Sequence, residues 1–472
     1  MTSETDTRRG AAEGPEAPGP TPPRRSGLAP PYPRWLLAAG VVLLAAVAVG
    51  PFVGYSPLLP VFLAVLALLA LRPVPGLGYV LVVLTAPLGL WFIGLERLVG
   101  DAFGGREYAL SISGTLVVAA LFALTAFLHR WTRRDVLAAG VALAILAVWS
   151  LIGIAHHGMA QTAVGVRLLV VPLLILLVLV ALPLPRLSTL VTVLSWVLIA
   201  NAVAALAELA VGPARLVQWG FEEGRAVRYI GDTFRVSGLT EFNAELGLLA
   251  GAYLLGYVAL WLTRGARPRR WSWHAGAAAA LLCLALSTSR SGALLVAAGV
   301  VAAAVSNRSG GAAARRRARL VGLGVVAALI VAFGALGATG SHSMLDRFAN
   351  WGRLLDDVTL AGGGIGSVGA ATSSRIASGQ QVFVDNYYVS LALQFGPVVA
   401  VAVVAALGYA LFRLWRRAAT DPSAGLHFAI LTGLAAASLV VEAWEYPGAM
   451  MCLAIFVAYA RRLRPAPTPF WW

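Results

Sequence analysis

The sequence predicts an all-α membrane protein, a polytopic bundle of about 12–14 transmembrane helices. Hydrophobic residues make up 59% of the chain and charged residues 12%, and the mean hydropathy is +0.80. A soluble domain carries roughly 25% charged residues. All 36 basic residues are arginine, and most of them lie between alternate apolar stretches. This spacing is typical of a chain that crosses a membrane repeatedly, with its basic connections on the cytoplasmic side.

The expected helices follow from apolar stretches that begin at residue 35. Several are close to the roughly 20 residues that cross a bilayer. Others are shorter and could be re-entrant, so twelve crossings is an alternative to fourteen. The stretches cover approximately residues 35–54, 57–72, 76–95, 109–129, 136–155, 163–183, 187–211, 242–263, 272–288, 291–306, 320–339, 387–412, 425–441 and 447–460.

Basic clusters follow every second stretch, at residues 129–134, 264–270, 315–319, 413–417 and 461–464. With fourteen crossings, all these clusters and both termini fall on the cytoplasmic side of the inner membrane. The formal charge of +15 is then a topology signal and an attraction to anionic lipid. It is no sign of nucleic-acid binding.

The chain divides into one membrane domain with two tails. Residues 1–34 are rich in proline and arginine and predict a disordered cytoplasmic tail. Residues 35–463 form the membrane domain, and 464–472 a second cytoplasmic tail. Two long extracytoplasmic loops, at about 212–241 and 340–386, mark the side where chemistry is expected.

The first long loop contains closely spaced arginines and acids. Arg235 lies seven residues before a membrane helix, beside Ser237 and Gly238, and is a candidate functional cation. Glu241 is a candidate base, although it could simply cap the helix that follows. For Arg228 we expect a solvated position with its charge paired inside the loop.

Two further arginines lie where topology does not favour them. Arg290 occupies a Ser-Thr-Ser-Arg-Ser-Gly turn, residues 287–292, whose hydroxyls suit an anion. Arg167 lies about one turn inside a span, where a charge is costly unless it faces a cavity or a partner. Glu208 and Glu245 are possible partners of Arg167. For both arginines the alternative is a side chain that snorkels to the interface.

The second long loop supplies the remaining candidates. Its glycine run at 362–367 could be a flexible connector or an anion-binding nest of backbone amides. Asp385 and Asn386 precede a membrane helix and could act as base or as helix cap. Candidate contacts to an acceptor sugar are Arg347, Arg353, Asn386 and Tyr387.

Four of these segments together resemble the O-antigen ligase and O-antigen polymerase family. They are the sequences at 235–243 (Arg-Val-Ser-Gly-Leu-Thr-Glu-Phe-Asn), 287–292, 362–367 and 385–396 (Asp-Asn-Tyr-Tyr-Val-Ser-Leu-Ala-Leu-Gln-Phe-Gly). They occur in the family's order, and the resemblance covers about 160–470. It implies a glycosyltransferase of the GT-C type that acts outside on a lipid-linked saccharide, without a metal or cofactor. It also implies that Arg167, Arg235 and Arg290 bind the donor diphosphate.

One position departs from the family pattern. Ligases of the family often carry a histidine before the asparagine of the last motif, and this chain has Asp385 there. An aspartate with an ordinary pKa of about 3.9 is ionised at neutral pH and can act as a base. We expect Asp385 to be the catalytic base, with Glu241 second. Ligase and polymerase activity both remain open.

The expected partners are a polyprenyl-diphosphate-linked glycan, a saccharide or surface-glycan acceptor and the lipid bilayer. Cys283 and Cys452 lie in apolar stretches and suggest neither a disulfide framework nor a metal site. Three alternative functions are a flippase or other transporter of lipid-linked glycan, a peptidoglycan polymerase and a structural scaffold. A transporter would need ionisable residues along a path through the bundle, whereas those here cluster near the outer ends of the spans.

Overall fold

The helical prediction is confirmed for the part of the chain that the computed structural model describes. The first four predicted stretches, both tails and Glu241 lie outside that part. The described residues are 132–181, 187–219, 227–230, 233–240, 242–264, 270–306, 316, 319–325, 327, 343–356, 358–369, 371–372 and 384–462.

The described helices agree closely with the apolar stretches. The stretches at 187–211 and 242–263 become α8 (Leu187–Val211) and α10 (Asn243–Arg264). The other long elements are α6 (Arg133–His157), α7 (Met159–Ala181), α11 (Trp271–Ser287), α12 (Arg290–Ser306), α14 (Ser343–Asp356), α16 (Pro397–Arg417), α17 (Pro422–Ala437) and α18 (Pro447–Arg462). Helix α10 occupies the middle of the bundle and packs against α8, α11, α12, α17 and α18.

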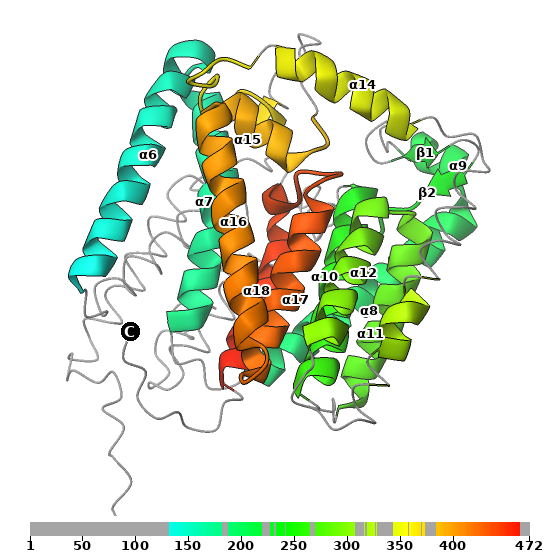
Figure 1. The fold of residues 1–472 in the computed structure, drawn as a ribbon. Helices are drawn as coiled ribbons and strands as arrows, with labels where there is room; N and C mark the ends of the chain where they lie inside the picture. The colour runs from blue at the N-terminus through cyan, green and yellow to red at the C-terminus, as the bar shows by residue number, and fades with distance from the viewer. Residues whose placement is uncertain are drawn as a thin grey trace, which may run out of the picture.

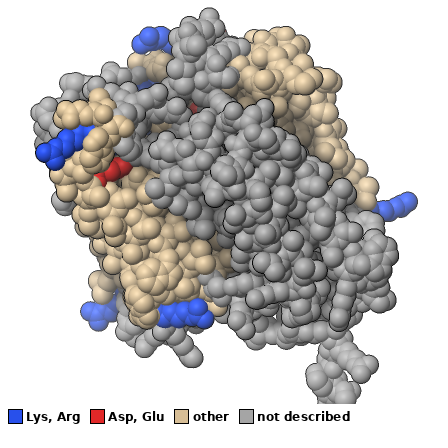
Figure 2. Space-filling model, turned by 180° about the vertical axis from the view of Figure 1, so that it is seen from behind, with Lys and Arg blue, Asp and Glu red and all other residues tan. Residues whose placement is uncertain are grey.

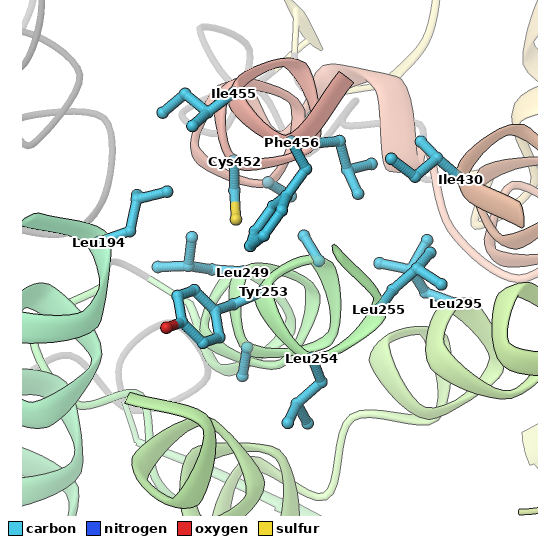
Figure 3. Packing of buried hydrophobic residues seen from close by; sticks show 14 of the residues in the cluster. Leu194, Leu249, Tyr253, Leu254, Leu255, Leu295, Ile430, Cys452, Ile455 and Phe456 are labelled. Atoms are coloured by element: carbon cyan, nitrogen blue, oxygen red, sulfur yellow. The ribbon is translucent and has the colours of Figure 1, made fainter. Parts of the chain in front are cut away.

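The core of the bundle surrounds α10 (Figure 3). Tyr253 of α10 is fully buried and packs edge-on against Phe456 of α18, with ring centroids 5.8 Å apart. Its phenol shares a 2.7 Å hydrogen bond with the hydroxyl of Ser195 in α8. The phenol needs this bond because an unsatisfied polar atom at such depth is costly. The phenol also donates to the carbonyl of Trp273 in α11 at 3.2 Å, so one side chain joins four helices.

Helices α10 and α12 approach each other unusually closely at a pair of glycines. A Cβ atom on Gly251 would lie 2.6 Å from the carbonyl oxygen of Gly292. Small residues allow helix backbones to pack at this distance, as is common in membrane bundles. The contact places the first turn of α12, which begins at Arg290, beside the first half of α10.

The stretch at 387–412, predicted as one helix, is two. Helix α15 (Tyr387–Phe395) ends at Gly396, whose φ is +81°, and α16 begins at Pro397. Proline at the first position and a glycine with positive φ are ordinary helix-boundary signals. The break separates a short helix beside the site from a long apolar one.

Two long loops contain structure that was not predicted. The first holds the short helix α9 (Pro213–Gln218) and an antiparallel pair of strands, β1 (Arg228–Ile230) and β2 (Thr233–Arg235). The second holds α14. Figure 1 shows β1, β2 and α14 at the same end of the bundle, called the loop end below.

Among the described residues, five helices are long and apolar enough to cross a membrane: α6, α7, α8, α10 and α16. Helices α11, α12, α17 and α18 are apolar but shorter. Seen from behind, the described surface is mostly uncharged, with arginines near its margins (Figure 2). Helices α6 and α16 expose many large apolar side chains, which suit contact with lipid. The chain is therefore a membrane protein.

Candidate functional site

The site is built on a turn that joins β2 to α10 at the loop end. The carboxylate of Glu208, from the last turn of α8, accepts hydrogen bonds from the backbone N–H groups of Ser237 and Gly238, at 2.9 and 3.1 Å. The side chain of Asn201, also in α8, accepts the N–H of Leu239 at 3.0 Å. These bonds satisfy amides that would otherwise be buried without partners. Glu208 therefore anchors the segment that follows Arg235.

Arg235 reaches from β2 into the turn between α11 and α12. Its Nε donates to the hydroxyl of Thr288 at 2.9 Å and to the carbonyl of Ser287 at 3.2 Å. Thr288 has a φ of +48°, a conformation that is a genuine outlier for a β-branched residue. Such strain persists only where the surroundings impose it, and it is concentrated at functional sites. The turn is thus shaped to receive this guanidinium.

Three other arginines surround Arg235. Arg228 is its direct partner in the β1–β2 ladder, and like charges at such a position are destabilising. Burial first, and then the charges of Arg228, Arg290 and Arg347, lower the pKa of Arg235 to about 10. Among the described residues, its hydrogen-bond partners are carbonyl and hydroxyl oxygens, with no carboxylate. Arg228, Arg235, Arg290 and Arg347, called the arginine group below, therefore bring four positive charges within electrostatic reach of one another.

Arg347 connects the arginine group to Asp385. Its guanidinium lies 3.4 Å from the Asp385 carboxylate and donates to the carbonyl of Val440 at 3.2 Å. Asp385 has a φ of +52° and is, with Thr288, one of two described non-glycine residues with positive φ. Each of the two contacts an arginine of this site: Thr288 accepts a hydrogen bond from Arg235, and Asp385 forms the ion pair with Arg347. The side chain of Asp385 is 42% exposed, so a substrate can reach its carboxylate.

A cluster of carboxyl groups lies beside Asp385, in the segment between α17 and α18. Glu442 precedes the short 3₁₀ helix η4 (Ala443–Glu445), and Glu445 is the last residue of that helix. Burial first, and then the negative charges of Glu442, Glu245, Asp385 and Glu445, raise the pKa of Tyr446. The phenol is therefore neutral and surrounded by acids. Nothing in the sequence patterns pointed to Glu442 or Glu445, because two glutamates in a short loop look like solvated charges.

Arg167 and Arg353 lie at other positions of the loop end. Arg167 is half-buried in α7, two residues before Leu169, whose carbonyl accepts the indole N–H of Trp444 at 2.9 Å. It is therefore close in sequence to the point where α7 meets η4. Arg353 is exposed on α14, six residues after Arg347. The arginines whose charges lower the pKa of Arg235 are thus Arg228, Arg290 and Arg347, and a role for Arg167 beside Arg235 remains a prediction.

Asn386 and Tyr387 have structural contacts at the start of α15. The side-chain oxygen of Asn386 caps the helix, accepting from the N–H groups of Tyr388 and Val389 at 2.9 and 3.2 Å. The N–H of Tyr387 donates to the carbonyl of Ser438 at 2.8 Å. The capping alternative therefore describes Asn386 in this structure, and the cap fixes the direction of the backbone beside Asp385.

The glycine run does not form an anion nest, because its amides already have protein partners. The N–H groups of Gly363 and Gly364 donate to the carbonyls of Leu393 and Gln394, at 2.7 and 3.0 Å. Those of Ile365 and Gly366 donate to the Trp149 carbonyl and the Gln394 side chain. The run is instead a connector held between α6, α7 and α15, and its backbone N–H groups at 362–367 all donate to protein oxygens.

The hairpin that carries Arg228 and Arg235 had a sequence signal of its own. Aromatic and β-branched residues flank Gly-Asp at 231–232, a two-residue linker of the kind that joins hairpin strands. The expectation of a solvated Arg228 is wrong: it is half-buried and its guanidinium lies 5.5 Å from the ring centre of Phe242. Glu241, the second candidate base, lies outside the described residues.

No family model, curated protein or solved structure matches this chain. Among the described residues, no group of three or more histidine, cysteine, aspartate or glutamate side chains has an arrangement that could hold a metal ion. The function is therefore inferred from the site itself.

Removal of the Glu208 carboxylate tests the architecture of the site. We expect Glu208→Ala to lower the free energy of unfolding by about 1–3 kcal/mol for each buried amide left unsatisfied. Glu208→Gln should lose less, because its amide oxygen can still accept from Ser237 and Gly238. Thermal unfolding of the purified protein in detergent measures both. Equal stability of the alanine variant and the parent protein would show that these bonds do not hold the turn.

Proposed function

We propose that the chain is a metal-independent glycosyltransferase at the outer side of the cytoplasmic membrane. It moves a glycan from a polyprenyl-diphosphate-linked donor to a saccharide or surface-glycan acceptor. Both termini lie in the cytoplasm, so the loop end faces outward. The resemblance to O-antigen ligases and polymerases supports this proposal, as does the grouping of charged residues at one end of a bundle of apolar helices.

The arginine group is the observation that carries the proposal. Arg235 is half-buried among three other guanidinium groups, and its own hydrogen bonds go to neutral oxygens in the described residues. Guanidinium stays protonated at neutral pH even at this lowered pKa and binds phosphate oxygens in bidentate fashion. A diphosphate supplies enough negative charge to offset several of these cations. At the end of an apolar bundle, its lipid tail can remain in the bilayer.

In the proposed reaction, the arginine group stabilises the leaving diphosphate and Asp385 takes the proton of the acceptor. The bond between the sugar's anomeric carbon and the diphosphate oxygen breaks, and the electron pair leaves with the diphosphate. Arg235 and Arg290 stabilise the charge that develops there, and Arg167 is proposed to contribute from α7. The acceptor hydroxyl forms the new bond to the anomeric carbon, and its proton passes to Asp385. Arg347 orients Asp385 through their ion pair.

Reconstitution distinguishes glycosyl transfer from transport. We expect the full-length protein in liposomes, supplied with a polyprenyl-diphosphate-linked oligosaccharide and an acceptor, to release polyprenyl diphosphate without ATP. Glycan length is followed on a gel and the released lipid by mass spectrometry. Movement of intact lipid between leaflets without bond cleavage would identify a flippase and contradict the proposal.

A further inference from the structure

Helix α16 lies on the outside of the bundle, at the front of Figure 1. Of the 21 residues of this fully described helix, Ala400 alone is buried. The helix runs from α15 at the loop end to Arg417 at the opposite end, called the far end below, and its 21 residues rise about 31 Å. This length matches the roughly 30 Å of a bilayer's hydrocarbon core. The last turns of α16 therefore lie at the level of lipid headgroups.

One face of α16 changes from apolar to basic toward the far end. Residues three or four positions apart are neighbours on a helix surface, so a face is followed in such steps. The exposed residues that share this face are Val398, Val401, Tyr409, Phe412, Arg413 and Arg416. Valine thus gives way to aromatic residues and then to arginine. A phospholipid has the same order, from acyl chains to a phosphate at the membrane surface.

Both arginines of this face fold back over an aromatic ring. The Cζ atom of Arg413 lies 5.6 Å from the ring centre of Tyr409, and its Nη1 donates to the Tyr409 hydroxyl at 2.8 Å. The Cζ atom of Arg416 lies 5.8 Å from the ring centre of Phe412. Each ring comes four residues earlier in α16, nearer the middle of the helix. A snorkelling arginine extends toward water instead, so these two guanidinium groups stay at the depth of the interface.

These two positive charges are oriented but not neutralised. Within the described part of the chain, Arg413 and Arg416 contact aromatic groups and no carboxylate. The nearest acid along the chain, Asp421, caps α17, and one of its oxygens accepts from the N–H and hydroxyl of Ser423 at 2.9 and 2.6 Å. An aromatic ring attracts a cation weakly, whereas a phosphate accepts two N–H groups of one guanidinium. A phosphate at this depth would therefore complete both arginines.

We infer that the far end of α16 binds an anionic phospholipid, with the lipid phosphate between Arg413 and Arg416. Tyr409 and Phe412 lie against the first carbons of the acyl chains, which continue along the apolar part of the same face. A zwitterionic lipid carries its own cation beside the phosphate, so the site favours a headgroup with net negative charge. This is a site on one helix, more specific than a general attraction of basic connections to the membrane. It does not depend on glycosyl transfer, because it lies at the opposite end from the arginine group.

Native mass spectrometry of the full-length protein in detergent, titrated with defined lipids, measures this binding. We expect dioleoyl phosphatidylglycerol to bind in preference to dioleoyl phosphatidylcholine, which has the same chains and the same phosphate. Arg413→Gln and Arg416→Gln should each lower the phosphatidylglycerol affinity about fivefold, and the double variant about twentyfold, as expected for arginines at a membrane surface. Tyr409→Phe should lower the affinity less, because the ring remains and only the hydroxyl that orients Arg413 is lost.

Arg133→Gln is the matched control, because Arg133 is exposed at the start of α6, at the same end of the bundle but on another helix. It should leave the affinity within about twofold of the parent protein, since salt screens distant exposed charges. An equal loss in Arg133→Gln would indicate a general attraction to the basic end and overturn the inference. Equal binding of the two lipids, or unchanged affinity of the double variant, overturns it as well.

Inorganic phosphate distinguishes a lipid site from a site for a free anion. We expect millimolar phosphate, at constant ionic strength, to leave phosphatidylglycerol bound, because a free ion cannot cover the apolar part of the face. Complete displacement of the lipid by phosphate would overturn the lipid assignment. All substituted side chains are exposed, so each variant is expected to fold, and thermal unfolding in detergent verifies this.

Discussion

Replacement of Arg235 by alanine is expected to lower glycosyl transfer by about 10²–10³-fold, the usual effect of removing one donor that stabilises developing charge. Arg235 is the member of the arginine group whose pKa the other three lower, and it bridges β2 to the strained turn at Thr288. Its loss would remove the contact to the leaving diphosphate that we propose for this guanidinium. The measurement is the initial rate of polyprenyl diphosphate release, with donor binding followed separately.

Two matched variants make the Arg235 result specific. Arg290→Lys keeps a positive charge but loses the planar fork, so it should also reduce transfer strongly. Arg215→Ala removes an arginine that is exposed in α9, and its rate should equal that of the parent protein. Normal product from folded Arg235→Ala and Arg290→Lys proteins would show that these arginines do not bind the leaving group.

Asp385→Asn is the second substitution for which we expect a large loss of glycosyl transfer. We expect transfer to fall by about 10²–10⁴-fold, the contribution of a positioned general base, while donor binding stays intact. Asparagine tolerates the positive φ of this position, so the backbone is preserved. It can still accept a hydrogen bond from Arg347 but cannot take the acceptor proton at neutral pH. Single-turnover kinetics measure the fall in transfer, and equilibrium binding measures whether the donor site is intact.

Asp356→Asn serves as the control for the base, because Asp356 is exposed at the end of α14. It removes one carboxylate from the same predicted loop and should leave turnover unchanged. Unchanged turnover in Asp385→Asn would exclude Asp385 as the base. Attention would then turn to Glu445, whose carboxyl oxygens pack closely against Gly369.

Much of the helical framework was predictable because it depends on local hydrophobicity. Helix α8 begins and ends where its apolar stretch does, and α10 differs from its stretch by one residue at each end. The break at Gly396 and Pro397 was missed, although both residues are visible boundary signals. The stretch around them is apolar on both sides, so hydrophobicity alone joined two helices into one.

The candidate site was predictable only in part. Arg290 was selected because an arginine at the outer end of an apolar helix goes against the positive-inside preference. Arg235 was selected from its Arg-Val-Ser-Gly context before a membrane helix, and Asp385 from the position where the resembled family often has a histidine. The half-buried position of Arg228 was not predicted. It depends on the pairing of β1 with β2, which places Arg228 opposite Arg235. For the glycine run, the sequence left a connector and an anion nest open. The structure decided for the connector, because the amides are satisfied by Leu393, Gln394 and Trp149, residues distant in the chain.

The sequence alone determined the class of molecule: apolar stretches separated by arginine clusters form a helical membrane bundle, because burial of hydrophobic surface and placement of positive charge act locally along the chain. Only the tertiary structure decided which charges meet. Arg235 reaches the Thr288 turn, Arg347 pairs with Asp385, and Glu442 is buried behind Val384 because helices far apart in sequence pack side by side. Electrostatic energy depends on distance in space and on burial, and neither is a property of a local stretch of sequence.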